Sequence, residues 1–134
     1  VDPTLKRLIG VISSHTQGCT YCTAHAGYGA NQLGVEAEKI AAVFEFDTSP
    51  LFTAAERAAL RVAWHGALQP SAVTDADIAA LTPHFSQREI VEIVAVLSLY
   101  GFLNRWNGTL NTELEAAPAD FAESLAALTP LRQD

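Results

Sequence analysis

Cysteine is scarce in this sequence: there are two among 134 residues, and both lie within residues 18–25. A secreted domain stabilised by disulfides needs more pairs that close longer loops, so the sequence excludes such a framework. A bridge between Cys19 and Cys22 would close a very small loop and add little entropic stabilisation. The pair therefore indicates thiol chemistry in a reducing cytoplasm. Methionine is absent altogether, so we expect that residues of the native protein precede Val1.

Basic residues are also few, and the chain has no long hydrophobic run. Eight lysines and arginines stand against fifteen aspartates and glutamates, which gives a net charge of -7. No basic stripe is available to neutralise phosphates, so we exclude nucleic acid as a partner. The longest apolar run, residues 93–103, contains Ser98 and is too short to cross a bilayer. The first residues show no signal-peptide pattern. We expect no membrane partner and a cytoplasmic location.

Hydrophobic side chains, in contrast, are abundant. They make up 49% of the chain against 17% charged residues, which excludes a disordered protein. The length suits one domain with a real core, so we expect a single domain over residues 1–134. Leu5, Leu8, Ile9 and Ile12 recur at helical spacing, whereas no strand-like alternation of useful length occurs. The sequence predicts an all-α fold of about six to seven helices.

Caps and breakers mark where these helices begin and end. Asp2 is a predicted N-cap with Pro3 at the first helical position, and Gly18 is a natural terminator. Capping boxes at residues 53–56 and 86–89 open two further helices. The expected helices cover residues 3 to about 17, 19–33, 35–46, 54–68, 74 to about 83, 86–103 and roughly 118–128.

Two of these helices carry specific expectations. Residues 35–46 are predicted as one helix with Ile40, Val43 and Phe44 facing inward. Residues 90–103 are apolar on nearly every side, which is typical of a helix surrounded by others. We expect this to be the central, wholly buried helix.

The candidate catalytic residues are Cys19, Cys22 and His25, which follow one another at intervals of three positions. A helix that starts near Cys19 places the pair beside free backbone N–H groups and the positive end of the dipole, which favour thiolate near neutral pH. One thiolate can attack a peroxide O–O bond to give a sulfenic acid, and the other sulfur can condense with it to a disulfide. His25 lies on the same helical face as Cys22, where it can accept or relay a proton. The pattern predicts a dithiol redox site with these three residues as catalytic groups.

Two other interpretations of the same residues stay open. The cysteines can be inert buried side chains. Alternatively, Cys19, Cys22 and His25 can form a metal-binding module, with a fourth ligand from a distant histidine (His15, His65 or His84). The chain has no second C-x-x-C and no paired histidine motif, so we predict no metal and no cofactor. His65 and His84 are expected to be packed or solvated, whereas His15, at the end of the first helix, is expected near the thiols.

Residues 13–33, SSHTQGCTYCTAHAGYGANQL, strongly resemble the carboxymuconolactone decarboxylase-like superfamily. That group includes the alkylhydroperoxidase D family and the peroxidase-related proteins. The resemblance continues through residues 33–35, 46–52 and 54–58 and returns in residues 101–107, GFLNRWN, so it covers most of the chain. It implies an alkylhydroperoxidase D-like helical fold that assembles into oligomers. We therefore expect a homo-oligomer, either a trimer, a hexamer or a dimer.

The resemblance also implies roles for individual residues. In peroxidase members the second cysteine attacks peroxide and the first resolves it, which points to Cys22 and Cys19. The best-studied members place the relay histidine where this chain has Ala26, and some relatives place it one position earlier, at His25. The same members have a glutamate where this chain has Arg7. The implied function is an antioxidant, peroxiredoxin-type oxidoreductase that acts on a hydroperoxide or another small molecule and is re-reduced by a thiol reductant or reductase.

The branch that names the superfamily offers an alternative. Its members handle a lactone acid and do not depend on such a dithiol. Arg61, Trp64 and His65 in the predicted fourth helix are candidates to line the pocket of such an enzyme. Because both cysteines are present, we favour the redox branch.

Overall fold

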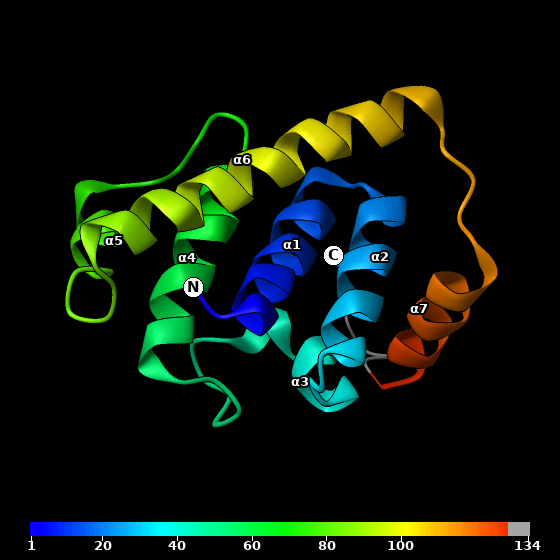
Figure 1. Cartoon of the computed structure of the whole chain (residues 1–134), viewed down its shortest axis with the longest axis horizontal. Coiled ribbons are helices and arrows are strands. Elements are labelled where there is room, and N and C mark those ends of the chain that lie inside the picture. Colours follow the sequence, from blue (N-terminus) through cyan, green and yellow to red (C-terminus); the bar gives the residue numbers. More distant parts are fainter. Residues whose placement is uncertain (129–134) are drawn as a thin grey trace.

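The structure, a computed structural model, describes residues 1–128, and in this range it contains helices and no strands. The all-α prediction is confirmed. Residues 129–134, the end of the predicted single domain, lie outside the described part. In chain order the elements are α1 (Pro3–Gln17), α2 (Thr20–Gln32), α3 (Ala37–Ala41), the 3-10 turn η1 (Val43–Glu45), α4 (Ala54–Ala67), α5 (Asp75–Ala79), α6 (Gln87–Leu110) and α7 (Ala116–Leu128) (Figure 1).

The helix ends follow the local signals. The Asp2 side chain accepts a hydrogen bond from the Thr4 backbone N–H at 2.8 Å, with Pro3 at the first helical position. Gly18 ends α1 in the left-handed conformation, with φ of 78°, where a side chain would be strained. The capping boxes of residues 53–56 and 86–89 are both formed, and residues 74–77 form a third.

Helix α1 lies at the centre of the molecule. It contacts α2, α4, α6 and η1, and in Figure 1 it lies between α4 and α2 with α6 crossing it. Its apolar face, Leu8, Ile9 and Ile12, is fully buried. Ser13 and Ser14 are buried beside that face, and Ser13 satisfies its hydroxyl by donating to the Ile9 carbonyl at 2.7 Å.

The prediction of one helix over residues 35–46 is wrong. The segment divides into the five-residue α3 and the 3-10 turn η1. Ile40, Val43 and Phe46 are all buried, and they are spaced by three residues. A 3-10 turn has three residues per turn and aligns such positions on one side, whereas a continuing α-helix would rotate Phe46 away. Val43 and Ile40 face the core as predicted, while Phe44 is half-buried.

The prediction that residues 90–103 form the central buried helix is also wrong. These residues belong to α6, which is longer than expected and lies across one side of the bundle (Figure 1). Of its side chains only Ile93 and Asn104 are buried, whereas Val91, Leu99 and Phe102 are more than half exposed. A helix with apolar side chains on every side can be buried completely, but in this protein other helices cover only one side of α6. No helix within residues 1–128 has the length and hydropathy needed to span a bilayer.

Candidate functional site

The two cysteines lie in the first turn of α2, where the chain turns out of α1. Cys19 is the N-cap residue, and its backbone N–H donates to the Ser14 carbonyl at 2.9 Å. The Cys22 backbone N–H donates to Cys19 Sγ at 3.3 Å, so the first sulfur takes the place of a capping oxygen. Both thiols are free and buried, with Cys19 6% and Cys22 4% exposed. The predicted position at a helix start is confirmed.

Burial changes the expected acidity of Cys19. Removal from water raises the pKa of the Cys19 thiol, and the neighbouring Cys22 side chain acts in the same direction. The Cys22 backbone N–H and the Asn104 amide oppose this by stabilising thiolate, but they do not outweigh it. The expectation that the helix start favours thiolate is therefore wrong for Cys19, because desolvation is the larger effect there.

Helix α6 supplies two amide side chains beside the thiols. Asn107 donates through Nδ2 to Cys22 Sγ at 3.5 Å. Asn104 donates through Nδ2 to Ser14 Oγ at 2.8 Å and is buried. Both belong to the GFLNRWN segment that contributed to the family resemblance, but nothing in the spacing of that segment indicated a contact with the cysteines.

His25 is one turn further along α2 and is half-exposed. It pairs with the Glu115 carboxylate, which comes from the segment between α6 and α7. The Tyr21 ring packs against the imidazole at 4.4 Å between centroids, and its hydroxyl donates to Glu115 Oε1 at 3.1 Å. The hydrogen bond from His25 lowers the pKa of Glu115. In residues 1–128 no hydrogen bond joins His25 directly to either sulfur. Sequence analysis missed Glu115 because 90 residues separate it from His25.

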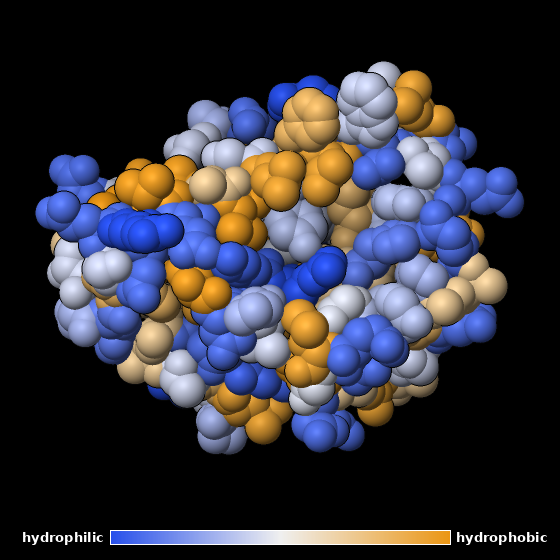
Figure 2. Space-filling view, viewed as in Figure 1, coloured by the Kyte–Doolittle hydropathy of each residue, from blue (hydrophilic) through white to orange (hydrophobic). Residues whose placement is uncertain are grey.

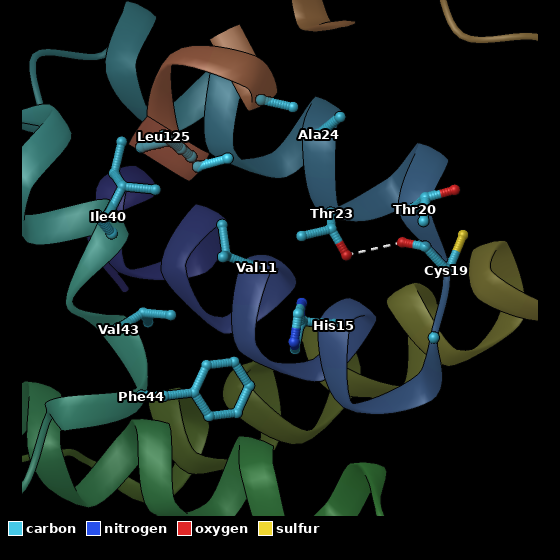
Figure 3. A pocket seen from close by; sticks show the side chains of 14 residues that line it. Val11, His15, Cys19, Thr20, Thr23, Ala24, Ile40, Val43, Phe44 and Leu125 are labelled. Carbon is cyan, nitrogen blue, oxygen red and sulfur yellow. Dashed lines mark hydrogen bonds between the residues drawn. The ribbon is translucent and has the colours of Figure 1, made fainter. Parts of the chain in front are cut away.

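A mainly apolar cavity of about 680 Å³ lies on the other side of Cys19 (Figure 3). His15 faces it, with its ring edge-on to Phe44 at 5.1 Å between centroids. The Thr23 hydroxyl donates to the Cys19 carbonyl at 2.7 Å. The Cys19 sulfur points away from the cavity's apolar side chains (Figure 3). His15 thus lies close to Cys19 as expected, but on the side of its backbone rather than beside its sulfur.

The other candidate residues lie elsewhere. His65 pairs through Nδ1 with Asp77 Oδ2 at 2.7 Å and joins α4 to the start of α5. Arg61 pairs with Asp47. None of the α4 candidates (Arg61, Trp64 and His65) lines the cavity beside Cys19 among the described residues. Within residues 1–128, no three His, Cys, Asp or Glu side chains are grouped so that they could hold a metal ion, so the geometry gives the metal-binding interpretation no support.

Comparisons with known proteins agree with this fold. A model of the carboxymuconolactone decarboxylase family matches residues 1–64. The apo crystal structure of the debrominase Bmp8 superposes with a TM-score of 0.87 at 35% sequence identity, over 93% of this chain and 67% of Bmp8. The chain belongs to the carboxymuconolactone decarboxylase-like superfamily. This superfamily includes enzymes, Bmp8 among them, and the family resemblance of the sequence is confirmed.

Two further proteins are more distantly similar to this chain. The uncharacterized Escherichia coli protein YnjA is 26% identical over 83% of this chain, and the chain spans 61% of the length of YnjA. A protein of unknown function from Agrobacterium tumefaciens, with a provisional description as the antioxidant defence protein AhpD, superposes with a TM-score of 0.80 at 22% identity, over 87% of this chain and 80% of its own. That second likeness concerns the fold alone.

Proposed function

We propose that this protein is a dithiol oxidoreductase that reduces a hydroperoxide with Cys19 and Cys22. The observation that carries the proposal is two free thiols in one helical turn, with the N–H of one residue on the sulfur of the other. A thiolate attacks the O–O bond, the alcohol leaves, and the sulfur becomes a sulfenic acid. The second thiol condenses with it, so that a disulfide and water form. One hydroperoxide thus takes up two electrons and two protons from the pair.

Cys22 is the proposed attacking residue and Cys19 the resolving one. The raised pKa of Cys19 keeps that thiol protonated, which suits a residue that reacts second. Cys22 has a side-chain donor, the Asn107 amide, at its sulfur. A thiolate that accepts a hydrogen bond is stabilised, so this contact favours attack by Cys22.

His25 is the proposed base of the site. Glu115 holds the imidazole by one nitrogen and Tyr21 packs on its face, which leaves the other nitrogen to exchange protons with a substrate or a water. In well-studied relatives an acidic residue is found where this chain has Arg7. Glu115 is a carboxylate from another part of the chain that can orient the histidine in its place.

Stopped-flow oxidation by cumene hydroperoxide tests the assignment. We expect Cys22→Ser to lose peroxide consumption by at least about a hundredfold, because the attacking thiolate is gone. Cys19→Ser is the matched control: it should react once and then accumulate a sulfenic acid that dimedone traps. Peroxide consumption by Cys22→Ser at the parental rate would show that the assignment is wrong.

A second candidate is the reductive removal of a halogen from a small aromatic ring. A cysteine-to-alanine variant of Bmp8 was crystallised with 2,3,4-tribromopyrrole and is 34% identical to this chain over 93% of it. In such a reaction two thiols and an aryl bromide give a disulfide, the debrominated ring and hydrogen bromide. Incubation of the reduced protein with 2,3,4-tribromopyrrole should release bromide, and absence of bromide rules this candidate out. Turnover of a lactone acid by a Cys19→Ser, Cys22→Ser double variant would instead favour the decarboxylase-type alternative.

We also propose that the protein is cytoplasmic, where a thiol reductant can reduce its disulfide. In addition, we propose that the chain forms a homo-oligomer. Figure 2 shows apolar side chains along α6, and Phe102 and Trp106 stack there at 5.9 Å between ring centroids while more than half exposed. Light scattering should give a multiple of 14.3 kDa, and Phe102→Ser should lower that mass. A parental mass of 14.3 kDa would contradict the proposal.

A further inference from the structure

One side of α6 presents two asparagines a single turn apart, and each is connected to one cysteine. Asn107 Nδ2 lies 3.5 Å from Cys22 Sγ and donates to it. Asn104 Nδ2 donates to Ser14 Oγ at 2.8 Å, while the carbonyl of the same Ser14 holds the Cys19 backbone N–H at 2.9 Å. Asn107 therefore contacts the Cys22 sulfur directly, whereas Asn104 is connected to Cys19 through Ser14.

The orientation of the Asn107 amide is determined by its other contacts. Its Oδ1 accepts a hydrogen bond from Thr112 Oγ1 at 2.8 Å, and its Nδ2 also donates to the Leu103 carbonyl at 3.0 Å. With the oxygen occupied by a donor, the nitrogen is the atom turned toward Cys22. A fixed N–H donor at a sulfur favours the charged form of that sulfur over the neutral thiol.

The Asn104 amide has a different set of partners. The residue is 6% exposed, Ser14 is fully buried, and Asn104 Oδ1 has no hydrogen-bond partner within residues 1–128. A buried acceptor without a donor is costly and needs a physical explanation. The hydrogen bond from Asn104 Nδ2 to Ser14 Oγ offsets part of this cost. Because the Ser14 carbonyl accepts from the Cys19 backbone N–H, this bond also ties Asn104 to the backbone of Cys19.

We propose that Asn104 and Asn107 are positioning residues for the dithiol, one for each sulfur. Asn107 is a fixed donor that prepares Cys22 for attack. Asn104 acts through Ser14: it holds the serine whose carbonyl fixes the Cys19 backbone, and so it helps to set the direction of the resolving sulfur. The direction of the Cys19 sulfur, away from the apolar cavity, agrees with this arrangement (Figure 3). The inference rests on the proposed dithiol function.

The test measures iodoacetamide alkylation against pH with one cysteine present at a time. In Cys19→Ser protein, where Cys22 remains, Asn107→Ala should slow alkylation at pH 7 by about three- to tenfold, because the sulfur loses its N–H donor. In Cys22→Ser protein, where Cys19 remains, the same substitution should change the rate by less than about twofold. Asn104→Ala should give the reverse pattern. Equal effects on both thiols, or an unchanged alkylation rate of Cys22 in Asn107→Ala, would overturn the proposal.

Two further variants keep the result interpretable. Thr112→Val leaves Asn107 in place but frees its amide to rotate, so Cys22 alone should show a smaller shift in the same direction as in Asn107→Ala. Arg105→Ala, an exposed position on α6 between the two asparagines, should leave both thiols unchanged. Alkylation requires no turnover, so a negative alkylation result would leave the peroxide proposal intact. Conversely, peroxide consumption by Cys22→Ser would contradict the peroxide proposal, and the alkylation rates could still be compared.

Discussion

Helices α1 and α6 are both rich in apolar residues and pack against each other, yet they are covered to very different extents. The apolar face of α1 is enclosed by α2, α4, α6 and η1. Helix α6 contacts α1, α2 and α4 on one side, and the opposite side carries exposed Val91, Leu99 and Phe102. The α6 sequence is the more apolar along its middle, but α1 is the central helix. Hydrophobicity therefore shows what a helix can bury, and only the arrangement of its neighbours decides what it does bury.

The largest expected effect contrasts a buried residue of α1 with an exposed one of α6. Ile12→Ala should lower the free energy of unfolding by about 2–5 kcal/mol, because Ile12 is fully buried and a cavity would remain. Leu99→Ala is the matched control, and both variants are made in the Phe102→Ser background so that contacts between copies are weakened. Leu99→Ala should then cost less than about 0.5 kcal/mol, since Leu99 is largely exposed in the single chain. Urea unfolding of both variants measures the difference. A similar loss of unfolding free energy in both variants would contradict the contrast between α1 and α6, and it would show that α6 is covered on both sides in solution.

A smaller effect is expected where the two helices touch. A Cβ added at Gly10 in α1 would lie 2.2 Å from Tyr100 Cζ in α6, so the ring or the helix must move. Gly10→Ala should therefore lower stability by about 1–3 kcal/mol, although alanine favours helix more than glycine does. Thermal unfolding checks this. A stabilised Gly10→Ala protein would mean that α6 does not approach α1 so closely.

The smallest effect has the opposite sign. Gly101 lies inside α6 beside Tyr100, but a Cβ there meets no atom within 4 Å. Gly101→Ala should raise stability by about 0.5–1 kcal/mol, because alanine has the higher helix propensity and nothing resists it. The same thermal measurement serves for both glycines. Destabilisation by Gly101→Ala would indicate a second chain packed closely against this part of α6.

The parts of the fold that sequence analysis predicted depend on residues close together in the chain. The start of α1 at Asp2, its end at Gly18 and the capping boxes of α4 and α6 each involve residues within four positions. The break between α3 and η1 could not be predicted in this way, because it depends on aligning Val43 and Phe46 with a core assembled from other helices.

The candidate site shows the same division. The C-x-x-C spacing and the helix start placed Cys19 and Cys22 together, and the structure has them in one turn. Asn104, Asn107 and Glu115 are 85–90 residues away from the partners they contact, and nothing in the sequence linked them. The burial of Cys19, which raises the pKa of its thiol, likewise could not be predicted from the sequence, because it depends on how the helices pack.

The sequence by itself determined where most of the helices begin and end, and that two thiols lie at a helix start, since capping and spacing act over a few residues. The tertiary structure alone decided that α1 rather than α6 is central, that Glu115 holds His25, and that the Asn107 amide of α6 contacts the Cys22 sulfur. These features depend on contacts between segments distant in the chain. Such contacts depend on how all the helices pack together, and local sequence patterns do not specify that packing.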